Sequence, residues 1–185
     1  MAAIPHLETK RLLLRPLELA DAAQIQAIFP QWEIVKYLQD KVPWPYPANG
    51  AETYCLDMAL PAMARGEAWH WTLRLKNVPE ALIGFVSLMK NEGENRGFWI
   101  DPRWQGQGLM SEACDAITDY WFEVLGFSVL RAPKAVANEP SRRISARQGM
   151  RVVETAERDY VSGRLASETW EITAEEWRAR KRTQR

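Results

Sequence analysis

Apolar and polar residues alternate along several short stretches of the chain, and this period of two predicts strands. Residues 69–75 alternate clearly, whereas residues 82–88 form an almost continuous apolar run that is typical of a more buried strand. Further strands are predicted at residues 11–15, 97–100, 129–136, 151–160 and 167–172.

Helices are predicted where the apolar spacing changes and where residues that begin or end helices flank the segment. A helix over residues 21–29 ends at Pro30, and one over residues 49–65 begins with Asn49 and Glu52 in the spacing of a capping box. The other predicted helices are residues 109–125, which Gly126 ends, residues 140–148, which Gly149 ends, and a last helix that Thr173 and Glu176 cap. Three prolines make residues 41–49 an irregular loop.

The order of these elements predicts the fold class. Helices and strands are mixed, and several strands follow one another early in the chain, which favours an α/β (α+β) fold. We expect a single mixed, mostly antiparallel central sheet flanked by helices on both faces. The chain has 185 residues, of which 46% are hydrophobic, so it suffices for one well-buried core.

Composition and charge exclude several classes of protein. The formal net charge is zero, so no global field attracts the chain to nucleic acid or to a membrane, and neither partner is expected. No apolar stretch reaches about 18 residues, and no signal peptide is recognisable, so we expect a soluble cytoplasmic protein. Neither Cys55 and Cys114 nor the lone His6 and His70 have the spacing of a metal site, and no metal is expected.

The segment from residue 97 to residue 125 carries the most informative chemistry. Gly106 and Gly108 lie where a predicted strand turns into a helix, so backbone amides there can point at an anion beside the positive end of the helix dipole. A Walker loop is excluded because Gly-Lys-Ser/Thr is absent. A Rossmann fingerprint is excluded because Ser111 stands in place of the third glycine. By itself the loop indicates an anion site or a plain strand–helix turn.

The wider sequence around this loop resembles a known family. Residues 103–113 are similar to the coenzyme loop of the GNAT N-acetyltransferases, whose pattern Gln/Arg-x-x-Gly-x-Gly/Ala is met by Gln105 and Gly108, with Met110 at the last position. The branch that includes ribosomal-protein acetyltransferases of the RimJ/RimL type is resembled by residues 9–17, 83–85 and 173–178 and by the segment from Asn138 to Arg143. The matches occur in the family's order from about residue 8 to residue 178.

This resemblance implies a GNAT-type acyl-CoA N-acyltransferase fold over residues 8–178, followed by a basic tail at residues 179–185. It implies an enzyme that transfers the acetyl group of acetyl-CoA to a primary amine by direct attack in a ternary complex. A homodimer is a family-level expectation. The residues that the resemblance assigns to the coenzyme are Trp99, Ile100, Gln105, Gly106, Gln107, Gly108, Leu109, Met110, Ser111, Asn138, Ser141 and Arg143.

The resemblance also implies candidate catalytic residues. Ser141 is expected to protonate the leaving thiolate, although it could equally serve as the N-cap of its helix. The branch often has a glutamate two residues before the strand glycine, and because Asn95 stands there, the neighbouring Glu94 is the candidate base. Tyr160 is a further candidate in a later strand. A backbone amide near Ile100 is the expected oxyanion donor.

The acceptor amine is less constrained. An α-amine with a pKa of about 8 is roughly 10% neutral at pH 7, whereas a lysine amine is only about 0.04% neutral, an extra cost of roughly 3 kcal/mol. With no strong base visible, a protein N-terminus or another amine of low pKa is favoured over lysine. The aromatic candidates for the acceptor cleft, each also compatible with core packing, are Trp32, Trp44, Tyr46 and Trp71.

Two other classes of function fit parts of the sequence. A non-catalytic acyl-CoA sensor would keep the loop and lack a base. A ribosome- or RNA-associated factor would use the basic run at residues 178–182, which is also typical of a solvated helix end.

Overall fold

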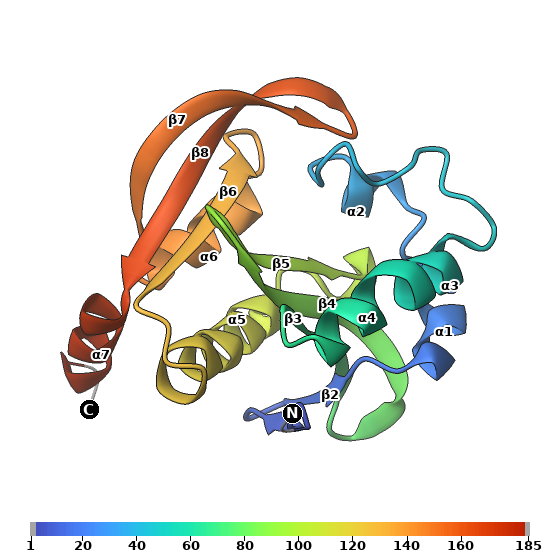
Figure 1. Ribbon diagram of the computed structural model, residues 1–185, viewed down its shortest axis with the longest axis horizontal. Coiled ribbons are helices and arrows are strands. Elements are labelled where there is room, and N and C mark those ends of the chain that lie inside the picture. Colours follow the sequence, from blue (N-terminus) through green and yellow to red (C-terminus); the bar gives the residue numbers. More distant parts are fainter. Residues whose placement is uncertain (1–2, 184–185) are drawn as a thin grey trace.

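The alternating stretches of the sequence form the strands of two antiparallel sheets in the computed structural model, which describes residues 3–183 (Figure 1). The first sheet has the order β1 (Leu7–Glu8), β2 (Leu12–Pro16), β3 (Ala68–Leu75), β4 (Val78–Asn91) and β5 (Glu94–Ile100). The second has the order β6 (Val129–Ala135), β8 (Gly163–Thr173) and β7 (Arg151–Tyr160). The predicted class, a mixed α/β fold with mostly antiparallel strands between helices, is confirmed.

The strands do not form the single sheet that the sequence suggested, because the ladder breaks between β5 and β6. The two strands meet where the Arg131 amide donates to Asn95 Oδ1 at 2.9 Å, so this amide points away from β8 and toward β5. Backbone groups alternate in direction along a strand, so Pro133 has the same orientation as Arg131. Proline has no N–H to donate, and β6 therefore cannot continue a ladder with β5.

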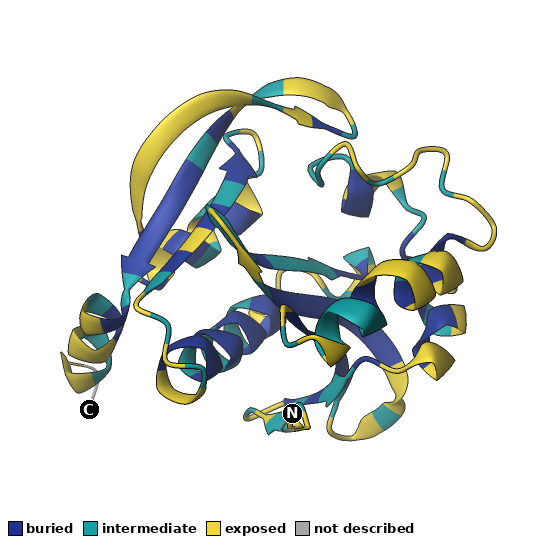
Figure 2. Cartoon of the chain, in the orientation of Figure 1, coloured by how far each residue is buried: buried dark blue, intermediate teal, exposed yellow. Residues whose placement is uncertain are grey.

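Helices cover both faces of the first sheet (Figure 1). On one face, α5 (Leu109–Asp119) and the wider turns of residues 120–124 pack against Trp69, Trp71 and Leu73 of β3. On the other face, α1 (Ala22–Ile28), α3 (Gly50–Tyr54) and α4 (Leu60–Ala64) form a second core with Phe85 of β4. Figure 2 shows the dark, buried stripe of α5 beneath the sheet and the exposed outer strand β7.

The sequence predicts capping boxes at the start of two helices, and the structure confirms the one at α7 but not the one at α3. Glu176 accepts from the Thr173 amide at 2.8 Å, and the Glu176 amide donates to Thr173 Oγ1 at 3.2 Å, so the predicted capping box of α7 (Ala174–Thr183) is confirmed. The box predicted at Asn49 is wrong, because the Asn49 side chain makes no capping bond. The Pro47 carbonyl and the Gln26 side chain instead hold the amides of Gly50 and Ala51.

The basic run near the C-terminus is part of α7, which continues to Thr183, and it does not form a separate tail over these residues. Arg178 pairs with Glu123 at 2.9 Å, and Lys181 pairs with Asp119 at 2.6 Å, so two of its cations are neutralised by the end of the α5 region. The boundary predicted after residue 178 thus falls inside α7, and residues 184–185 of the predicted tail lie outside the described residues.

The hairpin of β7 and β8 arches across the molecule and contacts the segment after α2 (Trp32–Val35), as Figure 1 shows. The Val161 amide donates to the Leu38 carbonyl at 2.9 Å, and the Ser162 amide donates to the Lys36 carbonyl at 3.2 Å. Gln39 and Tyr160 form a further bridge. The second sheet is thus attached to the N-terminal half at its tip, while its base stays beside β5.

Within residues 3–183 no helix is both long enough and apolar enough to cross a bilayer. The two cysteines, Cys55 and Cys114, are buried free thiols.

A buried histidine gives the fold a specific pH dependence. His70 is 3% exposed, stacks on Phe85 with ring centres 5.5 Å apart, and its Nδ1 has no partner among the described residues. Burial lowers its pKa from 6.5 to about 4. Between these pH values the unfolded chain binds a proton that the folded chain rejects, so the free energy of unfolding falls as pH falls.

We therefore expect the free energy of unfolding to fall by about 1.4 kcal/mol for each pH unit through this window on account of His70, roughly 3 kcal/mol in all. Urea denaturation at several pH values between neutrality and this acid limit measures the slope. His70→Phe removes the titrating group, and its slope should be shallower by that amount. Parallel slopes for the two proteins would show that His70 does not control the acid response.

Candidate active site

The break between the sheets opens into a cavity of about 520 Å³. One side of the cavity comes from β5 and β6, which border the break, and from the helix that follows β6, and the other side comes from the segment after α2 and the tip of the β7–β8 hairpin. The first side includes Gly97, Phe98, Ala132, Pro133, Lys134, Asn138 and Ser141, and the second includes Tyr37, Leu38, Gln39, Asp40, Lys41, Glu157, Arg158, Asp159, Tyr160 and Arg164. The cavity thus extends from the gap between β5 and β6 to the segment after α2 and the tip of the hairpin.

Ser141 lies in the first turn of α6 (Glu139–Arg147) and lines this cavity. The N-cap of α6 is Asn138, whose side chain accepts from the Ser141 amide at 3.4 Å. The alternative that Ser141 is itself the N-cap is therefore wrong, and its hydroxyl is not used to cap the helix. The structure brings Asn138 and Ser141 together in the cavity wall.

Lys134 is a site residue that the sequence analysis missed. Its Nζ donates to Ser141 Oγ at 3.0 Å and to the Ser141 carbonyl at 3.2 Å, and the side chain is buried. Burial, followed by the nearby Arg96 guanidinium, lowers the pKa of Lys134 well below its usual value. A signal was available, because Lys134 has the same orientation as the buried Leu130 and Ala132 in a strand that otherwise buries apolar residues.

Arg96 is a second buried cation beside the cavity. Its guanidinium donates to Gln148 Oε1 at 2.5 Å and to Thr118 Oγ1 at 3.3 Å, while its Nε has no partner among the described residues. The guanidinium of Arg96 and the ammonium of Lys134 lie 5.8 Å and 5.7 Å from the centre of the Phe98 ring. The wall of the cavity near Ser141 therefore carries two basic side chains.

The two other candidate catalytic residues also reach the cavity. Glu94 lines it and accepts a hydrogen bond from Gln39 Nε2 at 2.5 Å. Tyr160 lies 2.7 Å from Ser167 through their hydroxyl groups, and Ser167 in turn donates to the Lys134 carbonyl at 3.2 Å. Burial raises the pKa of Tyr160, so its hydroxyl stays protonated and is occupied by Ser167.

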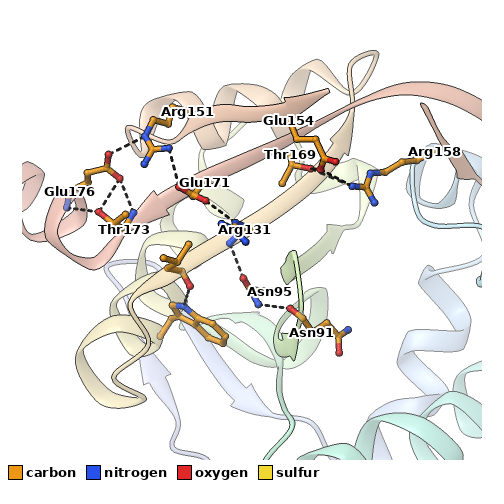
Figure 3. A network of polar contacts seen from close by, with 12 residues as sticks. Asn91, Asn95, Arg131, Arg151, Glu154, Arg158, Thr169, Glu171, Thr173 and Glu176 are labelled. Atoms are coloured by element: carbon orange, nitrogen blue, oxygen red, sulfur yellow. Dashed lines mark hydrogen bonds and ion pairs between the residues drawn. The ribbon is translucent and has the colours of Figure 1, made fainter. Parts of the chain in front are cut away.

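Asn95 has a structural role in place of a catalytic one. Its Nδ2 donates to the carbonyls of Met89 and Asn91 at 3.1 and 2.8 Å, and its Oδ1 holds the Arg131 amide. Figure 3 shows that Arg131 continues this chain of contacts to Glu171, at 2.7 Å, on β8. The network fixes the point at which β5 and β6 meet, and it places Glu94 and Arg96 on the cavity side.

The loop that the sequence assigns to the coenzyme is exposed and shaped by two glycines. Gly106 has a φ of +73° and Gly108 has a φ of +78°, a conformation that other residues adopt only with strain. Gly108 directly precedes the first residue of α5, so the amides of the first helical turn have no partner within the helix. The Gln105 amide side chain donates to the Ile100 carbonyl at 3.4 Å, which anchors the start of the loop to β5.

Arg11 supports this loop from the turn before β2 and was not singled out as a site residue. It donates to the Gln107 carbonyl at 2.9 Å and pairs with Glu112 of α5 at 2.9 Å. Thr9 also donates to Glu112. A positive guanidinium therefore lies beside the free amides of the loop. Leu109 and Met110 turn their side chains into the core, so only their backbone faces the loop.

Several candidates from the sequence lie away from the cavity. Arg143 is exposed and pairs with Glu139 at 3.3 Å, and it does not line the cavity. Trp71 is wrong as a substrate-contacting residue, because it is fully buried under α5 and donates to the Pro5 carbonyl. Tyr46 packs on Phe29 with ring centres 4.9 Å apart.

Three further tryptophans that the sequence predicted as site residues also have side chains outside the cavity lining. Trp32 and Trp44 are each 42% exposed and lie 5.7 Å apart, outside the cavity lining. Trp99 stacks on Phe85 at 6.1 Å, on the face of β5 opposite to Phe98. Its side chain therefore belongs to the second core, and only its backbone lies near the gap.

Comparisons with known proteins agree with this fold. The structure of ribosomal-protein-S5-alanine acetyltransferase from Vibrio fischeri is similar, with a TM-score of 0.78, 18% identity, and coverage of 94% of this chain and 98% of that one. Mycobacterium smegmatis RimJ in complex with CoA-disulfide is similar with a TM-score of 0.79, 17% identity, and coverage of 94% and 89%. The N-acetyltransferase YoaA of Bacillus subtilis is 30% identical over 148 residues, covering 78% of this chain and 82% of that protein.

The model of the acetyltransferase (GNAT) domain matches residues 11–151. The chain therefore belongs to the GNAT acetyltransferase family and is an acetyl-transferring enzyme. Among residues 3–183, no group of three or more His, Cys, Asp or Glu side chains is arranged to hold a metal.

The loop generates a prediction that separates backbone strain from coenzyme binding. Gly106→Ala and Gly126→Ala place a Cβ at nearly equal φ, +73° and +74°, with no atom within 4 Å in either case. Each should lower the free energy of unfolding by about 1 kcal/mol, because both force alanine into the left-handed region. Only Gly106→Ala should weaken coenzyme A binding, by about tenfold, because only it displaces the loop amides.

Urea denaturation and calorimetric titration with coenzyme A measure the two effects separately. If both variants bind coenzyme A as the wild type does, the loop around Gly106 does not hold the coenzyme.

Proposed function

We propose that this enzyme transfers the acetyl group of acetyl-CoA to a primary amine, either a protein N-terminus or a small-molecule amine, by direct attack in a ternary complex. The observation that carries the proposal is that one cavity contains Ser141, Glu94 and the open edge of β5. In this proposal they serve as the proton donor, the base and the backbone donors that the reaction needs.

The residues present fit an acetyl-CoA molecule. The pyrophosphate would lie on the free amides at residues 106–111, where the dipole of α5 adds roughly half a positive charge. Arg11 is the nearby cation that would complete this end of the site. The pantetheine arm would extend along β5, whose edge facing β6 has no ladder partner.

The open edge of β5 also supplies candidates for stabilising the developing oxyanion. The Asp101 amide donates to the Ile83 carbonyl at 2.8 Å, toward β4. Because amides alternate along a strand, those of Phe98 and Ile100 point away from β4 and into the gap. Fixed amides in a dry cleft contribute up to about 3 kcal/mol each to transition-state stabilisation. This is the backbone role that the sequence resemblance assigned near Ile100.

The side chains of the cavity divide the proton transfers between its two sides. Glu94 would take a proton from the attacking amine, directly or through water, because it lies on the side that faces the hairpin and Gln39. Ser141 would give its hydroxyl proton to the departing sulfur. Bound acetyl-CoA supplies the activated acetyl group, and the chain supplies position, charge and protons.

One carboxylate of the cavity lining is available to a cationic acceptor. Arg164 pairs with Asp159 at 3.1 Å and with Glu157 at 3.3 Å, so this cation offsets them. Asp40 has no ion-pair partner among residues 3–183, but it lies next to Lys41, which has none there either. Glu94 of β5 also has no ion-pair partner in that range, and its carboxylate would attract an ammonium group and hold it until it is deprotonated. An α-amine loses that proton more readily than a lysine does.

The first test measures coenzyme A release from acetyl-CoA across a panel of amines that includes a peptide beginning with alanine, the acceptor type of the similar Vibrio fischeri enzyme. We expect thiol release that depends on the amine and an acetylated product detected by mass spectrometry. Coenzyme binding without turnover on any amine would favour a sensor. Salt-dependent RNA binding that is lost on deleting residues 178–185 would favour a ribosome- or RNA-associated factor.

Ser141→Ala provides the residue-level prediction. It should lower kcat by about 100-fold or more, the usual contribution of a general acid, with little change in the affinity for acetyl-CoA. Ser162→Ala, at the exposed tip of the hairpin, is the control and should retain the wild-type kcat. An unchanged kcat in Ser141→Ala would remove Ser141 from catalysis.

A further inference from the structure

We propose that Lys134 is the source of the proton that Ser141 passes to the leaving sulfur, so that the two side chains act as one acid. This inference rests on the proposed acetyl transfer and deepens it, because it names a residue that neither the sequence resemblance nor the comparisons assign. It begins with the contact between Lys134 Nζ and Ser141 Oγ at 3.0 Å in the wall of the cavity.

Both hydrogen bonds of the Lys134 side chain go to Ser141. Lys134 Nζ also donates to the Ser141 carbonyl at 3.2 Å, so two hydrogen bonds direct the ammonium at one residue. The side chain is 5% exposed, and no carboxylate lies within ion-pair distance of it in the part of the chain that the structure describes. When the ammonium donates to Ser141 Oγ, the serine hydroxyl proton is free to point into the cavity.

The groups around Lys134 make its ammonium a stronger acid than an ordinary lysine. The titratable and charged groups that act on it are Arg96 on β5, Cys114 on α5 and Glu168 on β8. Glu168 is already paired with Arg142 at 2.9 Å, so it compensates Lys134 weakly. Burial and the repulsion of Arg96 dominate, and both favour release of the proton. An acid works best when its pKa lies near the working pH.

The proton transfer balances without any further reactant. The amine nitrogen forms a bond to the acetyl carbon, the bond between that carbon and the sulfur breaks, and its electron pair goes to the sulfur. The sulfur takes the Ser141 hydroxyl proton, and Ser141 Oγ takes a proton from Lys134 Nζ. The products are an amide, a thiol, an intact serine and a neutral lysine. Glu94 releases the proton of the amine to the cavity solvent, and the solvent returns a proton to Lys134 before the next turnover.

The pair removes a difficulty that Ser141 faces alone. A serine that gives up its proton in a buried site leaves an alkoxide, and an uncompensated buried charge is costly. Arg96 lowers that cost by its charge but cannot supply the proton, because a guanidinium stays protonated in proteins. Lys134 is the group in this wall that touches Ser141 and can release a proton.

The experiment uses the full chain and three variants. Lys134→Met keeps the length of the side chain and removes the proton, Lys134→Arg keeps the charge but does not titrate, and Lys76→Met is the control at a half-exposed surface lysine. With acetyl-CoA and the best amine, Lys134→Met should lose about 100-fold in kcat with the KM for acetyl-CoA within about twofold of the wild type. Lys76→Met should retain the wild-type kcat.

Two further readouts separate proton donation from a structural role. The wild-type kcat should fall as pH rises through the pKa of Lys134, and this alkaline limb should be absent in Lys134→Arg. An acetyl thioester of an acidic aromatic thiol, such as thionitrobenzoate, needs no proton on its leaving group. With that donor Lys134→Met should approach the wild-type rate, whereas a variant with a distorted site would stay slow with both donors.

A direct titration of Lys134 in the wild-type protein by nuclear magnetic resonance does not depend on any variant folding. A pKa between the assay pH and that of an ordinary lysine, near 10.4, supports the proposal. An ordinary or higher value overturns it, and so does a value well below the assay pH, because the lysine would then have no proton to give. Equal kcat values for Lys134→Met and the wild type with acetyl-CoA overturn it as well, while the proposed acetyl transfer stands. If the wild type acetylates no amine, the proposed function fails and this inference fails with it.

Discussion

The break between β5 and β6 is the constraint on which the rest of the structure depends. Pro133 deprives β6 of the donor that would extend the first sheet, and the Asn95 side chain holds the two strands together at one end only. A gap with unpaired backbone on one wall follows directly. The same break leaves the second sheet free to arch toward the N-terminal half and close the far side of the cavity.

The cavity wall next to Ser141 contains two buried basic side chains, which destabilise a fold unless they are compensated. Two cations, Arg96 and Lys134, are buried near one aromatic ring with little acidic compensation. Burying charge without a partner destabilises a fold, so such a cluster in a cavity is a marker of function. Its charge favours thiolate and alkoxide at the site, while the Glu94 carboxylate, which also lines the cavity, favours an incoming ammonium.

Most strands and helix ends could be predicted from residues that are neighbours in the sequence. The part of the site that could be predicted is the part in which the conformation of the backbone decides the function. The strands of alternating residues, the helix stop at Gly126 and the capping box at Thr173 depend on neighbours in sequence, and they are present as predicted. Asn49 failed as a cap because contacts from Pro47 and Gln26, both outside the local motif, hold the helix start. Trp71 failed as a substrate residue because either face of its strand can meet a core.

The sequence by itself determined the family, the glycine loop at the start of α5 and the placement of Asn138 and Ser141 in one turn of helix. These features need only short-range geometry and ordered motifs. Tertiary structure alone decided that Lys134 touches Ser141, that Arg11 supports the loop from a distant turn, and that Glu94 and Tyr160 face one cavity. The physical reason is that these contacts join residues on different elements, and strand pairing and helix packing bring such residues together only in the folded chain.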